Sequence, residues 1–282
     1  MSSRILAFSA DNFTEQNRHH VAGVSPLSAS KVPQVAIAFW IIKIAATTLG
    51  ETGGDALSMT LNFGYLLSSL IFMACFLIAL WAQVRAKAFY PFPYWTVIVT
   101  TTTVGTTMAD YADRSLGVGY PGGSLILFSI LMAVLSLWRY SAGKVSFRDI
   151  TSPKVEIFYW VTILFSNTLG TALGDFLADT PGVGYERGAL VFGSALSLVA
   201  LAYYLTNISH TTLFWTAFIL TRPLGATLGD LLTKPRAMGG LNLSRISSSL
   251  VIATFIVACI LITEQKAGGH PGEKKNPSVP KP

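Results

Sequence analysis

The sequence predicts an all-α, polytopic membrane protein with eight transmembrane helices in four parallel two-helix repeats. Composition is the first observation: the 282 residues are 51% apolar and only 12% charged, whereas soluble domains carry about 25% charged residues. The second is a series of apolar runs of about 20 residues, the length that a bilayer-spanning helix needs. The third is a motif that occurs four times. A very apolar soluble helical protein is the alternative, and the regular runs argue against it.

The repeated motif reads W-x9-G-x3-G-D-x8-G-Y. Its tryptophans are 55, 65 and 55 residues apart, and no gap is needed inside the motif, so the chain contains an internal repeat. The four copies are Trp40, Gly50, Gly54, Asp55, Gly64 and Tyr65; Trp95, Gly105, Ala109, Asp110, Gly119 and Tyr120; Trp160, Gly170, Gly174, Asp175, Gly184 and Tyr185; and Trp215, Gly225, Gly229, Asp230 and Gly239, with Gly240 in place of the tyrosine.

Apolar segments predict the helices in order, two for each repeat. They cover residues 34–57, 62–82, 94–112, 121–140, 155–178, 188–206, 211–231 and 243–263. Together they form one membrane domain, residues 33–265, with repeats at about 33–87, 88–148, 153–207 and 208–265. A polar cytoplasmic tail, residues 1–32, precedes this domain. A tail rich in Gly, Pro and Lys, residues 266–282, follows it and is predicted to be disordered and cytoplasmic.

The basic residues predict the orientation. Most of them fall in the two tails and in the loops after the second, fourth and sixth helices, whereas the opposite side has Arg114, Arg187, Lys234, Arg236 and Arg245. The positive-inside rule therefore places both termini in the cytoplasm. The net charge of +6 is then a topology signal, and we expect no nucleic-acid partner. Because each repeat has two helices, all four repeats share one orientation, which permits either a pseudo-fourfold ring or two pseudo-twofold halves.

Residues 33–263 resemble a family of bacterial membrane-anchored proteins known only as a repeat of unknown function, with four tandem two-helix repeats and one Trp in each. The segment AFWIIKIAATTLGETGGDALS, residues 38–58, carries the resemblance most specifically. The resemblance implies eight helices and a bacterial inner-membrane location. It implies no chemistry.

The small residues four positions apart in each motif predict close helix contacts, because small-x-x-x-small faces let two backbones approach in lipid. The aspartates that follow them are harder to explain by packing. A carboxylate at a helix C-terminus opposes the helix dipole, and near a membrane it needs a cavity or a partner. Asp55, Asp110, Asp175 and Asp230 are therefore the candidate ion path, although hydrated helix caps are the alternative interpretation.

Glu51 distinguishes the first repeat, because the equivalent positions are Thr106, Thr171 and Ala226. It lies four residues before Asp55 and so on the same helix face. Carboxylates and hydroxyls are ligands for hard ions such as Mg²⁺, Ca²⁺ or Mn²⁺. Glu51 and Asp55 are accordingly the candidate metal ligands, for a transported ion and not for a resident cofactor.

Two basic residues, Lys43 and Arg222, fall near the middle of predicted helices, where an unpaired charge is costly. They are the candidate charge partners of the carboxylates, whether structural or functional; snorkelling or binding of an anionic substrate are alternatives. The motif Trp residues are predicted to form an aromatic belt at the cytoplasmic interface, and the Gly-Tyr pairs to form turns with interfacial anchors.

The chain has no H-E-x-x-H, G-x-S-x-G or Walker motif, so we expect no enzymatic activity. Both cysteines lie in apolar segments and predict no disulfide. The favoured function is transport of a hard divalent cation such as manganese, or of a proton-coupled solute, with the lipid bilayer as partner. The alternatives are a non-transporting scaffold or sensor and a transporter of a small organic anion. A homo-oligomer is compatible with the pattern.

Overall fold

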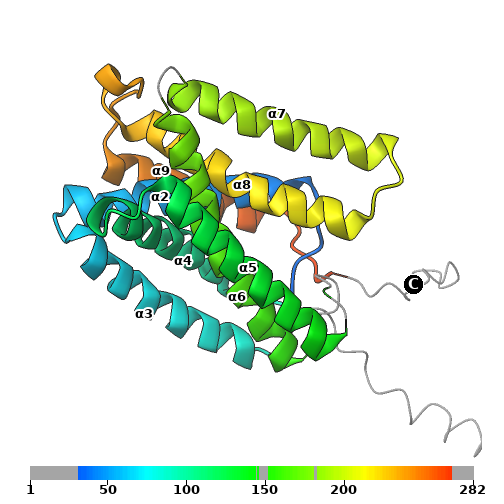
Figure 1. Cartoon of the computed structure of the whole chain (residues 1–282). Helices are drawn as coiled ribbons and strands as arrows, with labels where there is room; N and C mark the ends of the chain where they lie inside the picture. Colours follow the sequence, from blue (N-terminus) through cyan, green and yellow to red (C-terminus); the bar gives the residue numbers. More distant parts are fainter. Residues whose placement is uncertain (1–30, 144, 146–151, 181–182, 269–282) are drawn as a thin grey trace, which may run out of the picture.

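The computed structural model describes residues 31–143, 145, 152–180 and 183–268 (Figure 1). In this part of the chain every predicted apolar segment coincides with one α-helix, which confirms the all-α class. The helices are α2 (Ile37–Asp55), α3 (Gly64–Arg85), α4 (Pro91–Asp110), α5 (Tyr120–Ala142), α6 (Pro153–Ala178), α7 (Gly184–Leu205), α8 (His210–Thr233) and α9 (Arg245–Ile262). Short π-helical turns, Ala56–Thr60 and Tyr111–Ser115, continue α2 and α4.

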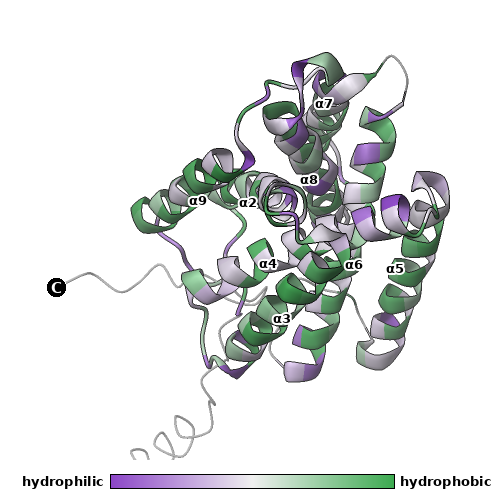
Figure 2. Ribbon diagram, turned by 90° about the vertical axis from the view of Figure 1, so that its left-hand side faces the viewer, coloured by the Kyte–Doolittle hydropathy of each residue, from purple (hydrophilic) through white to green (hydrophobic). Residues whose placement is uncertain are grey.

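The first helices of the four repeats form an inner ring in which α2 contacts α4, α4 contacts α6, α6 contacts α8 and α8 contacts α2. The second helices lie outside this ring. Each packs mainly on the inner helix of the next repeat: α3 on α4, α5 on α6, α7 on α8, and α9 back on α2 (Figures 1 and 2). Of the two arrangements that the sequence left open, the structure has the pseudo-fourfold ring.

Close backbone approach explains why the ring needs small residues. A Cβ at Gly50 on α2 would lie 2.6 Å from the Cβ of Thr102 on α4, and one at Gly105 would lie 3.0 Å from the backbone of Thr168 on α6. Gly225 on α8 meets Thr47 on α2 in the same way. The small-x-x-x-small faces therefore form the contacts between repeats, as predicted.

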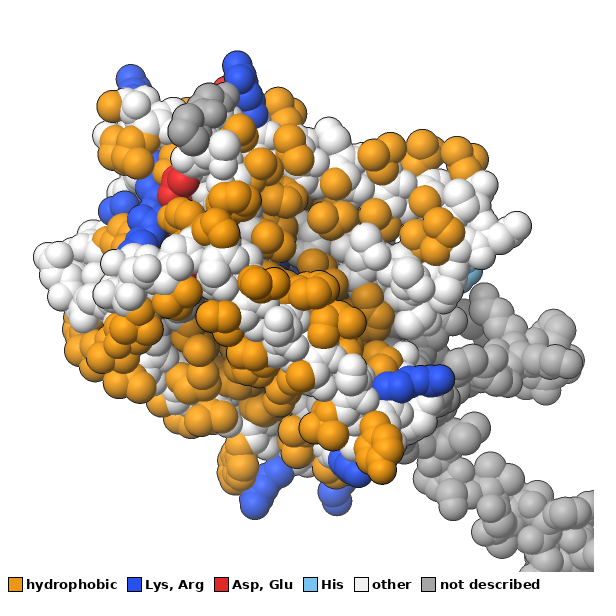
Figure 3. Space-filling model, viewed as in Figure 1, with side chains coloured by type: hydrophobic (Ala, Val, Ile, Leu, Met, Phe, Trp, Pro, Cys, Tyr) orange, Lys and Arg blue, Asp and Glu red, His pale blue; other side chains and the backbone are white. Residues whose placement is uncertain are grey.

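Polarity is reversed relative to a water-soluble protein. Threonines on the inner helices are buried, and their hydroxyls donate to carbonyls three or four residues earlier, as Thr101 does to Ile98 and Thr227 to Pro223. The outer helices expose leucines, isoleucines and phenylalanines along their length, so apolar side chains cover most of the surface in Figure 3 and the helices α3, α5 and α9 are largely green in Figure 2.

Five helices in the described part are long and apolar enough to cross a membrane: α3, α5, α6, α7 and α9. The inner helices α2, α4 and α8 are not among these five, and α2 contains Lys43, Glu51 and Asp55. Apolar outer helices around a polar inner ring are what a membrane protein requires, since lipid and not water then covers the outside.

Both ends of the helical domain meet on one side. Gln34 donates its backbone N–H to Lys266 O at 2.8 Å, and Gly268 donates to Val32 O at 2.8 Å. The sequence predicts that the C-terminal tail begins at residue 266. In the structure, however, residues 266–268 lie beside residues 32–34 and form these backbone hydrogen bonds. Residues 1–30 and 269–282, where the rest of the two predicted tails falls, lie outside the described residues.

The motif tryptophans correct one prediction. Trp95 and Trp160 are each only 1% exposed, so they do not form a belt against lipid. They pack with Tyr94 and Tyr159, whose hydroxyls are 2.9 Å apart, at the end of the ring opposite the aspartates. The reason is that these tryptophans are on inner helices, which the outer helices enclose.

Candidate functional site

The interior of the ring is built in layers. Positions four residues apart on a helix lie on one face, about one turn or 6 Å apart. Starting three residues after each Trp, these positions are buried in all four repeats. The layers are Lys43, Ile98, Ile163 and Phe218; then Thr47, Thr102, Asn167 and Arg222; then Glu51, Thr106, Thr171 and Ala226; and finally Asp55, Asp110, Asp175 and Asp230.

The ring brings together all five predicted ion-path carboxylates. Oxygens of Glu51, Asp55 and Asp110 lie within 4.8 Å of one another, and so do oxygens of Glu51, Asp175 and Asp230. Glu51 therefore belongs to both groups and stands at the centre of the cluster. Each of the five residues is at most 3% exposed.

Arg222 lies in the layer next to that of Glu51, on the side away from the aspartates, and fills the interior of the ring. Its guanidinium lies 3.2 Å from Glu51 Oε2, donates to Thr102 O at 3.3 Å, and also donates to Thr106 Oγ1. Its Cβ would be 2.6 Å from a Cβ at Gly170. Arg222, on α8, thus contacts the other three inner helices. Its predicted pairing with a carboxylate of another repeat is present in the structure.

Lys43 requires a correction. Among the described residues it makes no ion pair with a carboxylate. Its ammonium group lies 4.1 Å from the centre of the Phe218 ring and 3.5 Å from Asn167 Oδ1. It is two layers below Glu51, and Arg222 stands between it and the acids, so Arg222 takes the carboxylate that Lys43 was expected to share.

Three further cations complete the cluster, and the sequence interpretation assigned them only to the outer loops. Lys234 Nζ lies 3.1 Å from both Asp55 Oδ2 and Asp230 Oδ1. Arg114 Nε lies 2.8 Å from Asp110 Oδ1, and its Nη2 is 3.8 Å from Asp175 Oδ2. Arg245 Nε is 3.4 Å from Asp55 Oδ2.

A sequence signal for two of these cations exists. Arg114 and Lys234 each follow the motif aspartate of their repeat by four residues, the spacing of an ion pair on one helix face. The other two repeats have Met59 and Asp179 there. Burial lowers the pKa of Lys234, but Asp230 and Asp55 raise it more, so the net pKa lies above its usual value and the side chain stays charged. Arg245 is the first residue of α9 and has no such signal.

The rim of the cluster is formed by the Gly-Tyr turns. Gly64, Gly119 and Gly184 have φ of 74°, 73° and 71°, which confirms the predicted turns, since glycine adopts this conformation without strain. The tyrosine of one repeat reaches the next: Tyr120 donates to Asp179 Oδ2 at 2.7 Å, and Tyr185 donates to the other oxygen at 3.4 Å. These tyrosines, predicted as interfacial anchors, bond at the mouth of the cluster.

Three buried carboxylate oxygens in the cluster lack a hydrogen-bond partner among the described residues: Asp55 Oδ1, Asp175 Oδ1 and Asp230 Oδ1. Of these, Asp230 Oδ1 has the Lys234 ammonium at 3.1 Å, whereas Asp55 Oδ1 and Asp175 Oδ1 have no described cation in an ion pair with that oxygen. A buried charge without a partner is costly, and such oxygens are normally bonded. The donors in both groups are oxygens, with no His or Cys, which suits a hard cation more than zinc or copper. The predicted metal ligands Glu51 and Asp55 fit such an ion chemically.

The fold and the site define a tandem-repeat helical protein in which four equivalent helices enclose a charge-paired interior. The chain belongs to the family described as Repeat of Unknown Function (DUF347), which matches residues 38–89, 93–144, 158–209 and 213–263. Each match begins two residues before a motif Trp, so the family repeat and the sequence motif coincide. The resemblance to a four-repeat family of unknown function is confirmed. Comparison with curated proteins and with solved structures gave no match.

Proposed function

We propose that this protein transports a hard cation, either a divalent metal ion such as Mn²⁺ or a proton coupled to a second solute. In this proposal all eight helices cross a bacterial inner membrane, both termini are cytoplasmic, and the carboxylate cluster faces outward. The apolar outer helices and the excess of basic residues on the side of the termini support this placement.

The unpartnered oxygens of Asp55 and Asp175 carry the proposal. Four aspartates converge on Glu51, which makes five carboxylates, while four cationic groups pair with them: Arg114, Arg222, Lys234 and Arg245. One negative charge is thus left without a cation when every group is ionised. A proton or a metal ion that enters the cluster would remove this imbalance.

Lys234 suggests how an ion enters and leaves. Its ammonium lies between Asp55 and Asp230, where a transported cation would also bind, and it is attached through a flexible side chain. An arriving cation competes with this ammonium for the two carboxylates. On the side of Arg222 away from the cluster, the rings of Tyr94 and Trp160 pack together between the inner helices. An ion can therefore pass along the axis of the ring only if the inner helices move, as in alternating access.

The test is elemental analysis of cells with and without expression, each challenged in turn with Mn, Mg, Ca, Co and Zn. The variant Glu51→Gln/Asp55→Asn removes two carboxylates of the cluster. The matched control is Glu264→Gln, an exposed acid paired with Lys266 away from the cluster. We expect the cellular content of one metal to change selectively when the wild type or the control is expressed. When the double variant is expressed at equal membrane abundance, the content of that metal should equal that of cells without expression.

A second variant tests the competition. Lys234→Gln removes the ammonium and leaves an uncharged side chain, so metal bound to the purified protein should increase. If the cellular content of no metal changes in any strain, and the purified Lys234→Gln protein binds no metal, then transport of a divalent cation is rejected. Proton flux into proteoliposomes, measured as a function of pH, would then decide between proton coupling and a scaffold. The closed axis of the ring favours the scaffold.

A further inference from the structure

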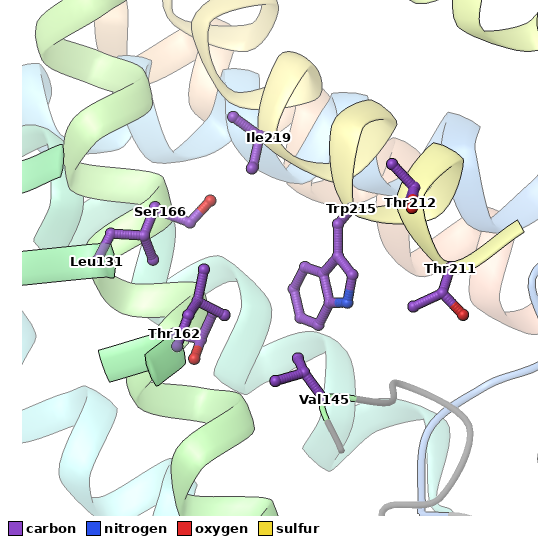
Figure 4. A pocket seen from close by; sticks show the side chains of 9 residues that line it. Leu131, Val145, Thr162, Ser166, Thr211, Thr212, Trp215 and Ile219 are labelled. Carbon is purple, nitrogen blue, oxygen red and sulfur yellow. The ribbon is translucent and has the colours of Figure 1, made fainter. Parts of the chain in front are cut away.

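A separate pocket of about 280 Å³ lies between α5, α6 and α8 (Figure 4). Its walls include Leu131 and Leu135 from α5 and Ile219 from α8. Thr162 and Ser166 from α6 and the Trp215 ring from α8 add polar atoms. None of the nine described residues in the lining is Asp, Glu, Lys or Arg, and none belongs to the carboxylate cluster.

Three polar atoms in this lining are buried and have no hydrogen-bond partner within the described part of the chain: Thr162 Oγ1, Ser166 Oγ and Trp215 Nε1. The hydroxyls contrast with Thr168 on the same helix, which donates to Leu164 O at 2.9 Å. Helical Ser and Thr normally find such a carbonyl when nothing else is present. The three groups therefore have donors available for a molecule in the pocket.

The Thr162 hydroxyl occurs in one repeat only. The positions equivalent to Thr162 are Ile42, Val97 and Ala217, none of which has a hydroxyl. Ser166 aligns with Ala46, Thr101 and Thr221, but the two threonine hydroxyls donate to carbonyls of their own helices, Ile98 O and Phe218 O, whereas the Ser166 hydroxyl has no such partner among the described residues.

We infer that the pocket binds one membrane lipid, with part of an acyl chain along the apolar walls and the oxygens of its ester groups as acceptors for the separate donors of Thr162, Ser166 and Trp215 (Figure 4). An indole N–H can only donate, so the ligand must offer an acceptor. The described lining residues carry no charge to pair with an ionic headgroup, so the headgroup is expected to lie outside them. On α5 the lining residues Leu131 and Leu135 are close in sequence to exposed Met132 and Leu137, the kind of surface that lipid covers.

The lipid assignment rests on the membrane placement proposed above, but it is independent of transport. Its test is native mass spectrometry of the full chain, purified in detergent and mixed with one phosphatidylglycerol of defined acyl chains. The test variant is Thr162→Val/Ser166→Ala, which removes both hydroxyls at nearly constant volume. The matched control is Thr254→Val/Ser197→Ala, because these hydroxyls donate to their own helices at exposed positions.

We expect one retained lipid on the wild type and the control. The lipid-bound fraction of the test variant should indicate an affinity at least about five-fold lower than that of the wild type. This is the loss expected for one to two hydrogen bonds. Trp215→Phe keeps the aromatic ring, removes the N–H, and should lower retention in the same direction. It serves as the second variant if the double variant does not fold, which melting curves establish.

Equal retention in the test and control variants would overturn the inference, as would a wild type that retains no lipid. A co-purified quinone or another carbonyl compound in place of lipid, identified by its mass, would also overturn it. Failure of this test leaves the metal measurements unaffected, because the pocket variants do not touch the carboxylate cluster.

Discussion

Arg222, on α8, contacts the other three inner helices from the interior of the ring. It is fully buried, and it bonds Glu51 and the backbone carbonyl of Thr102 from a third helix. An arginine suits this place because its planar group offers several donors in fixed directions. The other repeats need no such side chain: at the equivalent position Thr47 donates to Thr221 O, and Thr102 donates to Ala46 O.

Replacing Arg222 by Met should lower the free energy of unfolding by roughly 3–5 kcal/mol, since Glu51 would remain buried without its cation. Adding Glu51→Gln to Arg222→Met should recover a large part of this loss, because a neutral amide needs no cation. Thermal unfolding of the purified variants measures both effects. A double variant no more stable than Arg222→Met alone would contradict the assigned pair.

At the scale of helices, the contact between α2 and α4 depends on a missing side chain. Gly50 and Gly53 are both in α2, but only Gly50 faces a neighbouring inner helix closely. A Cβ at Gly53 would have its nearest atom, Ser249 Oγ, at 4.0 Å. The two glycines therefore separate the effect of helix propensity from that of helix packing.

Gly50→Ala should destabilise the protein by about 1–3 kcal/mol, because the added methyl group overlaps Thr102 and separates the helices. Gly53→Ala should be neutral or stabilising by up to about 1 kcal/mol, since alanine is the better helix former. Melting temperatures in one detergent compare the two. Equal shifts of the same sign would show that the inner ring does not pack as described.

At the scale of the whole molecule, cyclic order makes the repeats interdependent. Each outer helix packs mainly on the inner helix of another repeat; α5 covers α6 of the following repeat, and α9 covers α2 of the first. Each half of the chain therefore lacks a helix that the other half supplies. This differs from an open stack of repeats, in which only the ends are incomplete.

Expressed alone, residues 1–148 and residues 149–282 should each accumulate poorly, because α6 lacks α5 and α2 lacks α9. Expressed together, the two pieces should accumulate and co-purify through one tag. A control division inside α6, at residues 1–170 and 171–282, should fail to assemble because it interrupts an inner helix. Abundant, monomeric halves expressed alone would contradict the cyclic arrangement.

Helix order, repeat number and the carboxylates of the site follow from the chain read alone, because they depend on local composition and on spacing within one helix. Even Arg114 and Lys234 have a local signal, at four residues from Asp110 and Asp230. Lys43 shows the limit of such reasoning: burial was foreseen, but its neighbour is the Phe218 ring and not a carboxylate.

The ring itself required the tertiary structure. Periodicity tells which face of a helix is buried, but it does not tell which other helix covers that face. The contact of Lys234 with Asp55 joins the last repeat to the first, and the burial of Trp95 and Trp160 follows from the outer helices around them. Such contacts arise only when distant segments pack, so the charge partners and the lipid pocket had to be seen in three dimensions.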